Sequence, residues 1–175
     1  MDKNKAELIA RLMHGRDEWE LLINHVGAKR VGIGRISGHW SVKNIVAHIS
    51  VREQYLADRL AEIARGEQFY PCDTLALLDT FMAEFGYPDF ESPMISEEAA
   101  NEWVYQKYKN VEMRELIADE LHAFDAILAE GRAMPPEKLD QQGLINKIQA
   151  TTLDHYHHHA ADIKKHFIHS VLRNP

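Results

Sequence analysis

The sequence is poor in cysteine and lacks both long apolar runs and a basic excess. Its single cysteine, Cys72, leaves no partner for an intramolecular disulfide, so we expect a reducing compartment, the cytoplasm. No stretch of about 18 apolar residues is present and the first residues are charged, so we expect neither a membrane segment nor a signal peptide. The net charge of −7 argues against a nucleic-acid partner, which would require a basic surface.

Sustained alternation of apolar and polar residues, the pattern of β-strands, is also lacking. Apolar residues instead recur at steps of three and four, which predicts amphipathic helices. We expect four long helices, at residues 4–26, 42–65, 111–130 and 143–172, with short helices in the long connection between the second and the third. The 175 residues, 45% of them hydrophobic, therefore predict an all-α fold, a four-helix bundle forming a single domain over 1–175.

Several residues mark the ends and the inward faces of these helices. Ser41 and Ser96 have the side-chain chemistry of N-caps and precede apolar-periodic runs. Gly66 is expected to stop the second helix, and Gly131 the third. On the third helix, Leu121 is expected to face the core with its apolar neighbours.

Residues 154–166, DHYHHHAADIKKH, contain five histidines. This stretch has three possible interpretations: a metal site, the remnant of a purification tag, or a helix that is rich in imidazole. A tag would be an uninterrupted terminal run, whereas these histidines lie inside a periodic apolar pattern. The choice between the other two depends on where each side chain points.

A helical wheel separates these histidines. At about 100° per residue, His155 and His159 fall on one flank of the apolar stripe of the predicted fourth helix, and His157 and His158 fall away from it. Residues four apart on a helix are neighbours, so His155 and His159 can hold one ion. The alternative is that such a pair consists of ordinary surface or core residues.

A third ligand must come from another part of the chain. His48 lies on the flank of the apolar stripe of the second predicted helix, where a side chain can face the crevice between two helices. The remaining histidines outside the stretch lie beside loops or on faces directed away from the stripes: His14, His25, His39, His122 and His169.

Two motifs resemble those of the DinB-like four-helix bundles. Residues 39–60, HWSVKNIVAHISVREQYLADRL, are similar to that family's second helix, in which Trp-Ser and a hydrophobic residue precede a histidine by about two turns. Residues 155–163, HYHHHAADI, match the H-x-x-x-H pattern of its fourth helix through His155 and His159. The family includes YfiT-type metal hydrolases, thiol-dependent transferases and isomerases, and a cyclopropane-hydrolase-like resistance branch. Residues 66–100 match nothing in this family.

The resemblance implies a metal site formed by His48, His155 and His159. Three imidazoles leave a coordination position open on a divalent transition metal, Zn²⁺ or Ni²⁺ for preference. It further implies a metal-dependent enzyme that acts on a small molecule, by hydrolysis or by transfer involving a thiol cosubstrate, and that forms a homodimer. The alternative is a non-enzymatic or metal-free bundle that binds a small molecule in stress or resistance.

Acidic residues near the histidines are candidates for a supporting or catalytic role. Glu53, Asp154 and Asp162 are available to accept the second N–H of a ligand imidazole. Glu53 is also a weak candidate for a catalytic base. Because it falls within the apolar stripe of its helix, the simpler expectation is an ion pair with an Arg or Lys of another helix. Tyr156 is expected to be a core residue.

Overall fold

The computed structural model of the protein describes residues 3–139 and 143–171, and side chains of the last helix as far as residue 167. Within these residues the fold is all-helical, as predicted, and contains no β-strand. The helices are α1 (Lys3–Val26), α2 (Val42–Arg65), α3 (Leu75–Phe85), α4 (Glu97–Tyr108), α5 (Met113–Ala133), α6 (Pro136–Leu139), α7 (Leu144–Gln149), the π-helical turn η2 (Ala150–Asp154) and α8 (His155–Val171). None of these helices is both long enough and apolar enough to cross a membrane.

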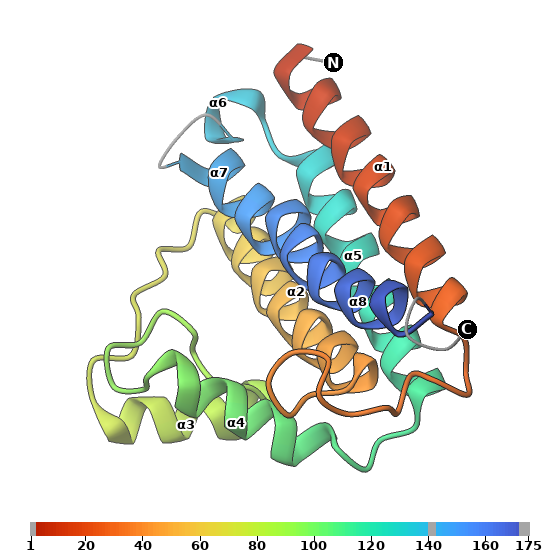
Figure 1. Ribbon diagram of the computed structural model, residues 1–175. Helices are drawn as coiled ribbons and strands as arrows, with labels where there is room; N and C mark the ends of the chain where they lie inside the picture. The colour runs from red at the N-terminus through yellow and green to blue at the C-terminus, as the bar shows by residue number, and fades with distance from the viewer. Residues whose placement is uncertain (1–2, 140–142, 172–175) are drawn as a thin grey trace.

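Four long helical segments run side by side (Figure 1). They are α1, α2, α5 and the continuous segment formed by α7, η2 and α8, an arrangement consistent with the predicted bundle. The short helices α3 and α4 belong to the long connection after α2 and lie across the end of the bundle where α2 begins (Figure 1). This placement brings α4 against α2.

Two apolar clusters fill the length of the bundle, and a third lies under the connection. Each long segment contributes a buried side chain to the first cluster, for example Leu12, Leu56, Ile127 and Ile148. The second cluster is built in the same way around Trp19, Ile45, Leu116 and Ile163. The third joins α2 to α3 and α4 through Val51, Leu78 and Val104. Because α4 has its own apolar contacts with α2, it forms a fixed wall beside the bundle.

The predicted ends of α2 are confirmed. Ser41 forms a capping box with Asn44, whose backbone N–H donates to the Ser41 hydroxyl at 3.3 Å. Gly66 has a φ of 81°, the left-handed conformation that favours glycine at a helix end. Ser96 caps α4 in the same way, by accepting from the backbone of Ala99 at 3.1 Å.

Two predictions for α5 are wrong. Gly131 does not end the helix, which continues to Ala133; a Cβ at Gly131 would lie 3.4 Å from Ile9 Cδ1, so this glycine lets α1 approach closely. Leu121 is 40% exposed, because the buried face of α5 instead includes Glu120. The sequence pattern missed this because Glu120 is buried through its bonds to α1.

Candidate metal centre

Three histidines from two helices converge at one point. His48 comes from the second turn of α2, and His155 and His159 come from the start of α8. The Nε2 atom of His155 lies 2.8 Å from His48 Nε2 and 3.2 Å from His159 Nε2. One ring nitrogen from each of the three lies within 4.8 Å of the other two. The structure thus brings together the three histidines that the sequence singled out.

The position of His155 depends on the π-helical turn directly before it. A straight helical wheel does not describe the fourth segment, because η2 takes about one extra residue into a single turn. Leu153, within this turn, packs so closely on Gly15 of α1 that a Cβ at Gly15 would overlap with its Cδ2 atom. Thr152, fully buried, donates its hydroxyl to the Ile148 carbonyl at 2.7 Å. Turns of this kind occur frequently at functional sites.

All three imidazoles are held in the neutral form that binds metals. Burial, followed by the neighbouring His155, keeps the pKa of His48 well below its ordinary value. Burial and then His159 lower the pKa of His155 to about 3, and burial and then His158 lower that of His159 to about 4. At neutral pH, protons therefore do not compete with an ion for these nitrogens.

The geometry of the three nitrogens fits a transition-metal ion. In a tetrahedral zinc site with Zn–N bonds of about 2.0–2.1 Å, ligand nitrogens are separated by about 3.3 Å. The His155–His159 separation of 3.2 Å matches this value, and the His48–His155 separation of 2.8 Å is about half an ångström shorter. His155 also forms a hydrogen bond with the backbone of Thr151, which leaves its Nε2 for the ion. The Nδ1 atoms of His48 and His159 are buried without a hydrogen-bond partner among the described residues.

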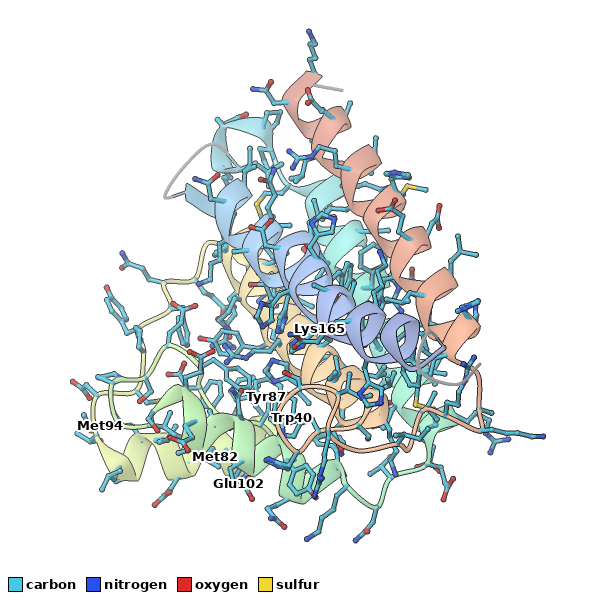
Figure 2. All side chains as sticks on the ribbon, in the orientation of Figure 1. Trp40, Met82, Tyr87, Met94, Glu102 and Lys165 are labelled. Atoms are coloured by element: carbon cyan, nitrogen blue, oxygen red, sulfur yellow. The ribbon has the colours of Figure 1, made fainter. Side chains whose placement is uncertain are left out.

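A cleft of about 1230 Å³ gives access to the histidines. Its walls come from the loop before α2, from the start of α4 and from α8; Trp40 of the loop and Glu102 of α4 are labelled in Figure 2. The Trp40 ring lies 5.0 Å from the ring of His48 and 6.5 Å from that of His159. Trp40 thus shields two of the three imidazoles and leaves the cleft side open.

The other histidines of the stretch divide less simply than predicted. His157 and His158 are both exposed, as expected, but His158 also lines the cleft. His158 can join His159 and Asp162 in a second possible ligand group, which shares His159 with the first. Asp162 is close enough to His159 to raise its pKa slightly, against the larger effect of burial. His166 packs against Phe167 and does not line the cleft.

Glu53 is fully buried in a polar network, separate from the residues that line the cleft. Arg16 of α1 is the cation that the sequence predicted beside Glu53, with its Nη1 atom 3.6 Å from Glu53 Oε2. Tyr156 donates its hydroxyl to Glu53, and Arg16 also pairs with Glu120 at 3.1 Å. Burial, then the charge of Glu120, raises the pKa of Glu53 to about 8. Tyr156 is a core residue, as expected, and stacks on Trp19 at 5.5 Å.

Sequence reasoning missed several residues of the cleft. His39 was set aside because it lies beside a loop, yet it forms part of the cleft wall. Three acidic residues of α4 also line it, namely Glu97, Glu98 and Glu102. They belong to the connection after α2, and only the packing of α4 on α2 places them near the histidines. No local signal in the sequence marks them.

Comparison of the chain with models of protein families, with curated proteins and with solved structures found no match. The chemistry of this centre therefore has to be inferred from its own residues.

Proposed function

We propose that the protein is a metal-dependent enzyme of the DinB-like type. One divalent transition metal ion, Zn²⁺ or Ni²⁺, is held by His48, His155 and His159, and a small molecule is hydrolysed or transferred to a thiol. The observation that carries the proposal is the convergence of three neutral imidazoles, two buried and one half-buried, at the floor of an open cleft. A structural zinc site would usually have four protein ligands, whereas three ligands leave a position for substrate.

The protein residues have distinct parts in this proposal. An ion bound here would lower the pKa of a water or thiol that coordinates to it, and so supply a nucleophile at neutral pH. The π-turn and the hydrogen bond to Thr151 orient the His155 ring. Trp40 keeps water from the faces of His48 and His159, and the cleft admits the small molecule.

Family membership and location are part of the same proposal. The motif from Trp40 to His48, the His155–His159 spacing and the all-helical fold support a DinB-like assignment. The single cysteine fits a reducing compartment such as the cytoplasm. A homodimer is proposed from the resemblance, and sedimentation of the purified protein would test it.

Elemental analysis of protein purified without a histidine tag tests the metal site. After incubation with Zn²⁺ or Ni²⁺ and removal of free ions, we expect close to one ion per chain. His48→Ala, His155→Ala and His159→Ala should each abolish stable binding while the helical circular dichroism is retained. The matched control is His157→Ala, an exposed histidine of the same helix outside the cleft, which should bind as the unchanged protein does.

Two results would overturn the proposal. Failure to retain either ion would favour the alternative, a metal-free bundle that binds a small molecule in the same cleft. Equal loss of the ion in His157→Ala would show that binding depends on histidine content rather than on the three converging nitrogens.

A further inference from the structure

The cleft above the three histidines has one strongly acidic wall. Glu97, Glu98 and Glu102 of α4 line it, and no Lys or Arg is found among the described residues that do so. Arg52 compensates part of this charge, since its Nη2 lies 3.5 Å from Glu97 Oε1. Arg52 thus offsets Glu97, which leaves Glu98 and Glu102 as an excess of two negative charges on this wall.

The helix dipole at the start of α4 explains only some of these three acidic residues. Glu97 and Glu98 occupy the first turn, where negative charge stabilises the helix dipole. Glu102 lies beyond that turn, where the dipole effect has faded. Its carboxylate accepts a hydrogen bond from Gln106 at 2.7 Å, which provides no positive charge. Glu102 therefore faces the cleft without a helix-terminal reason for being acidic.

A second side of the same cleft is aromatic and reaches the buried histidines. His39 and Trp40 line it from the loop before α2, with their rings edge to face at 6.3 Å. At the floor, His48 and His159 are only 4% and 5% exposed, and the Nδ1 atom of each has no hydrogen-bond partner among the described residues. Aromatic faces together with carboxylates are the surroundings that favour an organic cation.

We propose that the substrate of this site is a small organic cation, such as a quaternary or primary ammonium compound. Its positive group lies between the aromatic side and the carboxylates of Glu98 and Glu102, while its reacting end reaches the three histidines. This inference rests on the proposed function, because it assigns the substrate class of the same cleft. The cleft of about 1230 Å³ is large enough for such a molecule.

A pair of probes of the same shape isolates the effect of charge. Choline and 3,3-dimethylbutan-1-ol differ chiefly in that a quaternary nitrogen replaces a quaternary carbon. Their dissociation constants would be measured by NMR titration, on the metal-free protein and on the zinc-loaded protein. We expect choline to bind at least about fivefold more tightly than the neutral alcohol to the metal-free protein, from carboxylate attraction and cation–π contact.

Removing the two carboxylates should remove the preference. In the double variant Glu98→Gln/Glu102→Gln, the ratio of the two dissociation constants is expected to fall to within about twofold of one. The matched control is Glu7→Gln/Glu18→Gln, which makes the same change in net charge at exposed positions of α1. Its ratio should remain that of the unchanged protein.

The outcomes separate this inference from the proposed function. Equal binding of the two probes, or a preference that survives Glu98→Gln/Glu102→Gln, overturns the cation assignment even if zinc binds normally. A preference lost equally in the α1 control overturns it as well, because only net charge would then matter. If choline is preferred through Glu98 and Glu102 but no metal is retained, the cation site stands and the metal-dependent function fails.

Discussion

Substitution of Gly15 by alanine should weaken metal binding from a distance. Gly15 is buried in α1, and an added Cβ would overlap with Leu153 Cδ2 while lying 3.7 Å from Leu153 Cγ. Leu153 is 6% exposed and belongs to the core, so it has little room to move away. Because Leu153 lies in the π-turn that directly precedes His155, the strain reaches the first residue of α8.

The expected magnitudes differ for stability and for binding. Overpacking costs about 1–3 kcal/mol, and the better helix propensity of alanine returns up to about 1 kcal/mol. The free energy of unfolding should therefore fall by about 0–3 kcal/mol, which leaves the protein folded. Metal ligands tolerate displacements of only about 0.2 Å, so a shift of His155 should weaken zinc binding by about tenfold or more.

The assay compares zinc affinity, measured by competition with a chelator, with thermal unfolding of the same proteins. Adding Leu153→Val to Gly15→Ala removes the overlapping atom and keeps a side chain at the 3.7 Å position, so zinc affinity should recover. Gly131→Ala is the matched control: this helical glycine lies outside the π-turn, and an added Cβ would lie 3.4 Å from Ile9 Cδ1. Unchanged zinc affinity in Gly15→Ala, an equal loss in Gly131→Ala, or no recovery in the double variant would each refute the reasoning.

Three further predictions concern stability. The folded pKa of Glu53, about 8, lies above its unfolded value of 4.5, so between these pH values the folded state binds more protons than the unfolded state. The free energy of unfolding should therefore fall as the pH rises through this window, by at most about 1.4 kcal/mol per pH unit. Urea titrations of Glu53→Gln should show a flatter dependence, and an unchanged slope would contradict the assignment. Ser41→Ala should lower the free energy of unfolding by about 1 kcal/mol, and so should Ser96→Ala at the cap of α4. If the caps act through stability alone, zinc affinity should be unchanged in both variants. Arg52→Gln removes contacts to α4 at 3.4 and 3.5 Å and should speed amide exchange in residues 97–108; slower or equal exchange there would show that Arg52 does not hold this wall.

The sequence predicted those parts of the structure that depend on neighbouring residues. The ends of α2 follow from Ser41 and Gly66, whose cap chemistry acts within one turn, and the His155–His159 spacing already places two imidazoles on one helix face. Leu121 was misplaced because the buried position beside it belongs to Glu120, whose partner Arg16 is more than a hundred residues away. No composition or periodicity indicates such a pair.

The cleft could not be predicted from the sequence because it too depends on contacts between residues far apart in the chain. Its acidic wall is formed by α4, which is held against α2 by contacts such as those of Val104 in the third apolar cluster. The π-turn was likewise not predicted; its Leu153 packs closely on Gly15 of α1, a contact between distant parts of the chain.

Burial sets the chemistry of this centre more than the number of histidines does. His157 and His158 carry the same imidazole as their neighbours but are exposed, whereas His48 and His159 are almost fully enclosed. Enclosure lowers the pKa of the ligand histidines, since a charged imidazole loses its hydration there. At an exposed pair with the same spacing, protons would compete with an ion for the ring nitrogens near pH 6. The enclosed set holds neutral nitrogens over the whole physiological range, and the carboxylates of α4 line the same cleft. The packing of α2, α4 and α8 therefore has two consequences: it places the α4 carboxylates that would select a cation, and it keeps the three imidazoles at the floor neutral.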